Sequence, residues 1–141
     1  MPLIYPLTAA CIGMVATAYH VPEVDMWVLL AQEHGKIGAI STNKNRTFDI
    51  GPFQINSRWL GNFTQLWHLP SQQETLERLR DHGCWNAAAA GAIYRYEFDR
   101  SGDRRTALGL YHSARPALAA KYLVQLDQKY RLLFGDAVSP P

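Results

Sequence analysis

Residues 48–60 read FDIGPFQINSRWL and follow a polar segment, residues 36–49, in which apolar residues show no helical repeat. Glycine, serine, asparagine and threonine in that segment favour a loop, and we expect a small β-hairpin around residues 43–46. Longer stretches with helical character lie on both sides. The sequence therefore predicts a mainly α domain, of the α+β type, in which a small β-hairpin insert forms a cleft.

Six segments around this insert carry helical signals. Pro22 suits the first turn of a helix that has Glu23 and Asp25 at its positive end and Gly35 placed to end it. Residues 71–74 have the form of a capping box, and the helix they open would close at Gly83. Residues 84–98 contain an alanine run and are the candidate for a central buried helix. The remaining expected helices span residues 8–20, 103–110 and 116–134.

The 141 residues fit a single domain, which we take as residues 1–141 with a short tail from about residue 135. The net charge of +2 gives no footprint for nucleic acid, although all 14 Lys and Arg residues lie at or beyond Lys36. The apolar stretch at residues 8–18 is too short to span a bilayer and has no basic flank. We therefore expect no stable membrane span, and no clear signal peptide is visible.

Glu33 lies three and four positions after Leu30 and Leu29 and seven after Met26, so it shares their apolar helix face. Apolar surroundings remove water from a carboxylate, disfavour its charged form and raise its pKa. A general acid that works near neutral pH needs such a pKa. The spacing alone leaves open a plain structural role, in which Glu33 swings past the helix end into solvent.

Asp49 follows the polar loop and precedes residues 50–57. A hairpin aspartate in a polar setting stays ionised. Two carboxyl groups whose environments push their pKa values apart form the acid-and-stabiliser pair of glycosidases. Taken alone, an aspartate near a glycine in a loop is also an ordinary turn residue.

Glu33 together with residues 48–60 resembles the active-site stretch shared by animal-type lysozymes and secretion- and conjugation-associated lytic transglycosylases, within the lysozyme-like superfamily. Members have a helix-ending glutamate, then Asp-x-Gly-Leu-Met-Gln-Ile-Asn-Ser-Arg-Trp, then a Tyr-Asn pair on a later helix. Residues 107–114 supply the later match, and the likeness extends over about residues 11–122. It implies a lysozyme-like helical domain with a cleft-forming β insert.

The resemblance assigns roles to single residues. Glu33 matches the catalytic acid and base, and Asp49 the second catalytic carboxylate. Gln54 matches a glutamine that contacts the sugar or the catalytic carboxyl, and Tyr111 a tyrosine near the glutamate. Asn56 is a candidate substrate-binding residue of the cleft. The resemblance further implies that the following pair, Arg58 and Trp59, holds the β insert against the helices.

The sequence departs from the family pattern at three places. His34 stands where members have serine, and His112 where they have asparagine. Residues 52–53 are Pro-Phe instead of Leu-Met. Because both histidines occupy cleft positions of the family, we include His34 and His112 among the candidate substrate-binding residues.

Two cysteines far apart in the sequence permit one disulfide without proving it. The bacterial branch has one early cysteine and one before the central helix, so the resemblance implies a bond between Cys11 and Cys84. Several disulfides, as in animal lysozymes, are excluded by the count of two. The resemblance also implies a location in the periplasm or cell envelope.

Other side chains have plainer interpretations. Glu33, His34 and His112 lack metal-ligand spacing, so we expect no metal and no cofactor. We expect Trp27, Trp67 and Trp85 to be core aromatics, with sugar stacking as the alternative.

The function implied is that of a peptidoglycan lytic transglycosylase acting on glycan strands, with 1,6-anhydro-muramic acid as a product. A hydrolytic muramidase of the same fold and a non-catalytic glycan-binding or scaffold module are the alternatives. Components of an envelope-spanning secretion, pilus or conjugation machine are expected partners. We expect the chain to be a monomer.

Overall fold

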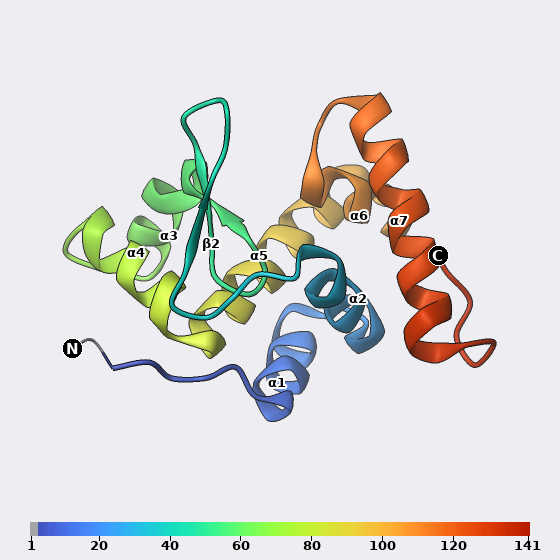
Figure 1. Ribbon diagram of the computed structural model, residues 1–141, viewed down its shortest axis with the longest axis horizontal. Coiled ribbons are helices and arrows are strands. Elements are labelled where there is room, and N and C mark those ends of the chain that lie inside the picture. Colours follow the sequence, from blue (N-terminus) through green and yellow to red (C-terminus); the bar gives the residue numbers. More distant parts are fainter. Residues whose placement is uncertain (1–2) are drawn as a thin grey trace.

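The computed structural model describes residues 3–141, which form seven α-helices, one short 3-10 helix and a three-stranded antiparallel sheet (Figure 1). The predicted mainly helical fold with a small β insert is confirmed. The helices are α1 (Ala9–Tyr19), α2 (Glu23–Glu33), α3 (Leu60–Leu66), α4 (Gln72–Asp81), α5 (Gly83–Ser101), α6 (Arg104–His112) and α7 (Pro116–Phe134). The strands are β1 (Ile40–Thr42), β2 (Phe48–Ile50) and β3 (Ile55–Asn56), and η1 is the 3-10 helix Ser57–Trp59.

Local sequence signals fix several helix starts. The hydroxyl groups of Thr8 and Ser71 and the carboxylate of Asp103 each accept a hydrogen bond from the backbone N–H three residues further on. These side chains satisfy donors that the first turn of a helix leaves unpaired. Pro116 occupies the first position of α7, where its missing N–H costs nothing.

Two helix ends differ from the prediction. The last residue of α2 is Glu33, and the residue that caps it is His34, with a positive φ of 52°, instead of Gly35. The helix expected to close at Gly83 ends at Asp81, and Gly83 opens α5. Helix α3 and strand β3 lie in a stretch for which the sequence analysis predicts neither.

The predicted central helix, α5, runs through the middle of the molecule and packs against α1, α4 and α6 (Figure 1). Ala87, Ala89 and Ala90 are fully buried on it. Their small side chains let the neighbouring helices approach closely. In the same view α7 lies on the side of α5 away from α4, where it packs against α2 and α6.

A buried asparagine attaches the β insert to the helices. The Oδ1 atom of Asn86, on α5, accepts the N–H of Phe53 at 2.8 Å. Its Nδ2 donates to the carbonyl oxygens of Ile50 at 2.8 Å and Leu79 at 2.9 Å. Because the side chain is completely buried, all three bonds form away from water and hold the insert in one position.

A buried ion pair anchors α2, the helix that carries Glu33. Asp25 is fully buried and accepts hydrogen bonds from Arg104 at 2.8 Å and 2.5 Å, from Tyr94 at 3.3 Å, and from Tyr130. Burial and the charge of Asp25 raise the pKa of both tyrosines, so the phenols stay protonated as donors. Asp25 therefore connects α2 to α5, α6 and α7, beyond the helix-dipole role expected from its position.

The disulfide Cys11–Cys84 joins α1 to the first turn of α5, with Cα atoms 5.5 Å apart, and confirms the expected pairing. Cys11 is buried and Cys84 is exposed. Among residues 3–141, no helix is long and apolar enough to cross a membrane.

Candidate active site

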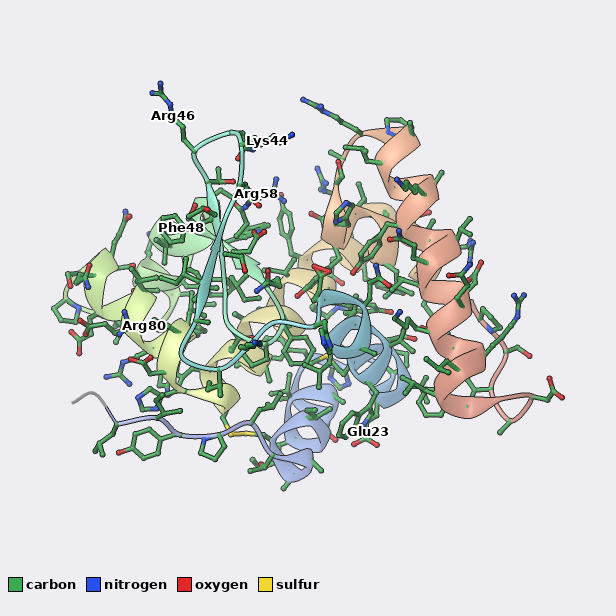
Figure 2. All side chains as sticks on the ribbon, in the orientation of Figure 1. Glu23, Lys44, Arg46, Phe48, Arg58 and Arg80 are labelled. Carbon is green, nitrogen blue, oxygen red and sulfur yellow. A yellow bond between two sulfur atoms is a disulfide. The ribbon has the colours of Figure 1, made fainter. Side chains whose placement is uncertain are left out.

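A cleft of about 610 Å³ lies between the β insert and the α6–α7 side of the molecule. Lys44 and Arg46 project from the tip of the hairpin (Figure 2). His34 lies outside the cleft wall, exposed at the end of α2. The other predicted site residues all line the cleft: Glu33, Asp49, Gln54, Asn56, Tyr111 and His112.

Glu33 is the last residue of α2 and sits in surroundings that favour its protonated form. Burial is the main cause, and it raises the pKa of Glu33 from the ordinary 4.5 to about 7. A hydrogen bond from Tyr122 opposes this increase, and the negative charge of Asp49 adds to it. A carboxyl group with this pKa both donates and accepts a proton near neutral pH.

Tyr122, on α7, is a site residue that the sequence analysis did not single out. Its Oη donates a hydrogen bond to Oε2 of Glu33 at 3.3 Å. The expected tyrosine, Tyr111, instead donates to the carbonyl oxygen of Phe53 at 3.0 Å. Burial and the charge of Glu33 raise the pKa of both tyrosines, so both remain neutral donors.

Asp49 lies in the middle of β2 and is oriented by amide groups. Its Oδ1 accepts from Nδ2 of Asn56 at 3.0 Å, and its Oδ2 accepts from Nδ2 of Asn43 at 3.1 Å. Asn56 faces it in the sheet register. Within residues 3–141, no Lys or Arg forms an ion pair with Asp49. Its charge is therefore directed at the cleft without a neutralising cation.

Directly after Glu33, the end of α2 touches the loop after β2. The N–H of Gly35 donates to the carbonyl oxygen of Pro52 at 3.1 Å. A Cβ atom at Gly35 would lie 2.0 Å from the carbonyl oxygen of Gly51 and 2.6 Å from Nε2 of Gln54. Position 35 therefore requires glycine, because any side chain would collide with backbone.

Gln54 lines the cleft from the same loop. It has a positive φ of 53°, and its Nε2 donates to the carbonyl oxygen of Gly51 at 3.0 Å. This bond uses one amide hydrogen and leaves the Oε1 atom of Gln54 free of side-chain partners within the described part of the chain. The structure therefore presents an amide oxygen of Gln54 as an acceptor for a ligand hydroxyl.

His112 forms part of the opposite wall. Its imidazole stacks on the ring of Tyr122, with centroids 4.5 Å apart and an interplanar angle of 4°. Loss of hydration lowers the pKa of His112, with the charge of Asp49 opposing the change. The ring is therefore mainly neutral at pH 7 and adds little positive charge beside Glu33.

Arg58 and Trp59 differ in what they contact. The ring of Trp59 meets that of Tyr96, on α5, edge to face at a centroid distance of 5.9 Å, which attaches the insert to the helices as expected. Both residues also line the cleft, and Arg58 is exposed. The expectation that both residues hold the insert therefore fits Trp59 only.

The remaining tryptophans lie outside the cleft wall. Trp27, Trp67 and Trp85 are all half-buried. Trp67 packs on Phe63 and meets Trp85 edge to face, both at a centroid distance of 4.7 Å. These contacts are those of core aromatics and not of sugar platforms.

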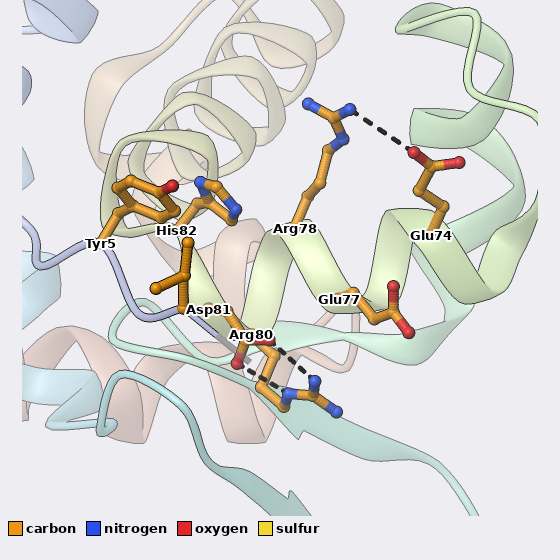
Figure 3. A pocket seen from close by; sticks show the side chains of 8 residues that line it. Tyr5, Glu74, Glu77, Arg78, Arg80, Asp81 and His82 are labelled. Atoms are coloured by element: carbon orange, nitrogen blue, oxygen red, sulfur yellow. Dashed lines mark hydrogen bonds and ion pairs between the residues drawn. The ribbon is translucent and has the colours of Figure 1, made fainter. Parts of the chain in front are cut away.

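A second hollow of about 430 Å³ lies where the N-terminal segment crosses the α4–α5 junction (Figure 3). Tyr5 stacks on His82 there, with ring centroids 4.4 Å apart. Charged side chains that line this hollow form ion pairs with one another, for example Arg80 with Asp81 at 2.8 Å. None of the predicted site residues lies in this hollow. Among residues 3–141, no group of three His, Cys, Asp or Glu side chains is arranged to hold a metal ion.

Comparison of the whole sequence with known protein families finds no matching family, and comparison with curated proteins finds no significant match. The chemistry of the cleft is therefore what indicates a function.

Proposed function

We propose that this protein is a peptidoglycan lytic transglycosylase that cleaves the β-1,4 bond between N-acetylmuramic acid and N-acetylglucosamine. The observation that carries this proposal is that Glu33 and Asp49 line the same cleft, where burial of Glu33 raises its pKa to about 7. A protonated carboxyl group and a second carboxylate in one groove form the acid-and-stabiliser pair of glycosidases. The resemblance of residues 48–60 to muramidases supports peptidoglycan as the polymer.

In the first step, protonated Glu33 donates its proton to the glycosidic oxygen as the bond to the anomeric carbon breaks. The leaving sugar departs with a hydroxyl group, and the muramyl ring carries positive charge. Tyr122, which bonds to Oε2, stabilises the carboxylate that forms. The negative charge of Asp49 stabilises the sugar cation across the cleft.

In the second step, the Glu33 carboxylate accepts the proton of the muramyl 6-hydroxyl while that oxygen attacks the anomeric carbon. A 1,6-anhydro ring closes, and Glu33 is protonated again with the proton of the 6-hydroxyl, while the proton that it gave in the first step stays on the leaving sugar. No water is consumed. One residue serves as acid and then as base, which a pKa near 7 permits.

A hydrolytic muramidase is the second candidate, and the setting of Asp49 favours it. Asp49 is held by two amide groups and has no cationic partner in residues 3–141, so it is available to trap or stabilise the sugar cation until water attacks. The product would then have a reducing end.

Digestion of purified sacculi, followed by separation of the muropeptides with mass detection, tests both candidates. We expect anhydro-muropeptides, which are lighter than hydrolysed ones by one water. Reducing-end products alone would favour the hydrolase. A protein that binds sacculi and releases no muropeptide would be a non-catalytic glycan-binding or scaffold module.

We further propose that the protein works in the periplasm or cell envelope, where it opens the wall locally for a secretion, pilus or conjugation machine. The Cys11–Cys84 disulfide supports this setting, because such bonds persist in oxidising compartments. Fractionation of the producing cell, with the thiols of the protein blocked before lysis, would test the location.

A further inference from the structure

A side pocket of about 260 Å³ opens beside the cleft. The two hollows share Arg58, Trp59 and Ala114 in their walls, and α5 closes the side pocket with Tyr96 and Arg100. With less than half the volume of the cleft, the side pocket suits a short branch better than a further length of glycan.

Arg58 supplies the positive charge of this side pocket. Its Cζ lies 5.3 Å from the ring centroid of Trp59, and no carboxylate in residues 3–141 forms an ion pair with it. Arg100, by contrast, is paired with the buried Glu97 at 2.7 Å. Of the two arginines that line the side pocket, Arg58 is therefore the one whose guanidinium N–H groups can bind an anionic ligand.

Aromatic rings supply the rest of the surface. Tyr96 is 51% exposed and meets the half-buried Trp59 edge to face. Rings of this kind pack against the aliphatic part of a ligand while a neighbouring arginine binds its acidic group. The combination fits a carboxylate on a short chain.

We propose that the side pocket binds a carboxylate of the peptide branch on the muramic acid held in the cleft, with Arg58 as its partner. This inference rests on the proposed function, because it states which form of the glycan the same site prefers. A glycan strand in the cleft would bring its peptide branch to Arg58, the residue that both hollows share.

The first test compares cleavage rates on glycan strands that carry their peptides and on strands stripped of peptides by an amidase. The ratio of interest is the rate on strands with peptides divided by the rate on stripped strands. We expect Arg58→Gln to lower this ratio about 5-fold, the upper end for an exposed ion pair. Arg46→Gln is the matched control, because it removes the same charge from the hairpin tip without touching the side pocket (Figure 2). An unchanged ratio in Arg58→Gln would overturn the inference.

The second test measures binding without catalysis. The probe is the N-acetylated tripeptide alanyl-γ-glutamyl-diaminopimelate, and the readout is the NMR signal of each indole N–H. We expect the Trp59 signal to move and the Trp27 signal to stay, with the Trp59 response lost in Arg58→Gln. An unmoved Trp59 signal, or an equal response to inorganic phosphate, would overturn the carboxylate site even if the protein cleaves glycan. A Trp59 response in a protein that cleaves no glycan would instead refute the proposed enzyme and retain the carboxylate site.

Discussion

The phenolic oxygen of Tyr122 lies 3.3 Å from Oε2 of Glu33 and donates a hydrogen bond across 89 positions of sequence. The bond brings α7, near the C-terminal end, into contact with the last residue of α2. It also opposes the effect of burial on the pKa of Glu33. The acid strength of Glu33 therefore depends on how α7 packs as well as on the apolar face of α2.

Replacing the acid tests the central assignment. Glu33→Gln keeps the shape of the side chain and removes the transferable proton, so we expect cleavage of sacculi to fall by about 100-fold or more. Circular dichroism and the melting temperature at pH 5 should stay close to those of the parent. Glu23→Gln, an exposed change on the same helix, is the control and should retain activity. Parent-like turnover by Glu33→Gln would contradict the assignment.

Removing the hydroxyl of Tyr122 should make Glu33 a weaker acid. Tyr122→Phe loses a bond that stabilises the carboxylate, so the pKa of Glu33 should rise further above about 7. The alkaline limb of the pH–rate profile should move up by as much as about one pH unit. In Tyr111→Phe, which loses a bond to the Phe53 carbonyl instead, that limb should stay in place. A downward shift in Tyr122→Phe would refute this relationship.

The raised pKa of Glu33 also predicts how stability changes with pH. Below pH 4.5 the residue is protonated in both the folded and the unfolded state, and its contribution is fully present. Between pH 4.5 and about 7 the unfolded state loses the proton first, so the free energy of unfolding falls. The full effect is roughly 3 kcal/mol. Urea unfolding of the parent and Glu33→Gln across this range measures it as the difference between the two curves, and parallel curves would contradict it.

Asp49→Asn separates the two catalytic candidates. Asn offers one acceptor oxygen where Asp49 accepts from two amide groups, so the hairpin should also loosen slightly. In a transglycosylase we expect a milder loss than in Glu33→Gln, because the N-acetyl group of the muramyl sugar can also stabilise the cation. If Asp49→Asn is as inactive as Glu33→Gln, and the parent releases only reducing-end muropeptides, the protein is a hydrolase. Rates and muropeptide masses from one digestion provide both measurements.

The disulfide should contribute strongly to stability. Cys11 and Cys84 are 73 positions apart, and closing so long a loop is worth roughly 4 kcal/mol in the chain-entropy model. We expect the double variant Cys11→Ser, Cys84→Ser to unfold at a lower urea concentration than the parent. Its free energy of unfolding should be lower by the amount given for loop closure. The parent treated with reductant should match it. Two free thiols in protein isolated from the cell envelope would refute the bond in the native setting.

Much of the fold could be predicted because its signals are local. Ser71, Asp103 and Pro116 mark helix starts through bonds or backbone angles within one turn, and α7 has the predicted bounds of residues 116–134. The signal for the hairpin is equally local, because it consists of the polar and glycine residues of segment 36–49 itself. Helix α3 and strand β3 are too short to show a repeat of apolar residues, so their formation depends on packing.

The parts of the site that sequence analysis missed depend on distant partners. Tyr122, Leu126 and Tyr130 follow each other at four-residue spacing and are all buried, which marks a helix face that carries two phenols into the interior. That spacing is the signal that could have drawn attention to Tyr122, although its bond to Glu33 requires the folded chain. Asp25 likewise gains its partner Arg104 from 79 positions away.

The contact at Gly35 sets how closely the end of α2 approaches the loop after β2. Glu33 lies two residues before Gly35, and Asp49 lies two residues before Gly51, so the two chains touch two residues along the sequence from each acid. A methyl group there would act as a wedge, since it would lie 2.0 Å from the carbonyl oxygen of Gly51. In glycosidases the gap between the carboxyls decides whether a water fits between the second carboxylate and the sugar. A residue without a side chain thus lets the chain after Glu33 rest on the chain after Asp49, and an attempt to widen the proposed catalytic groove would begin at Gly35.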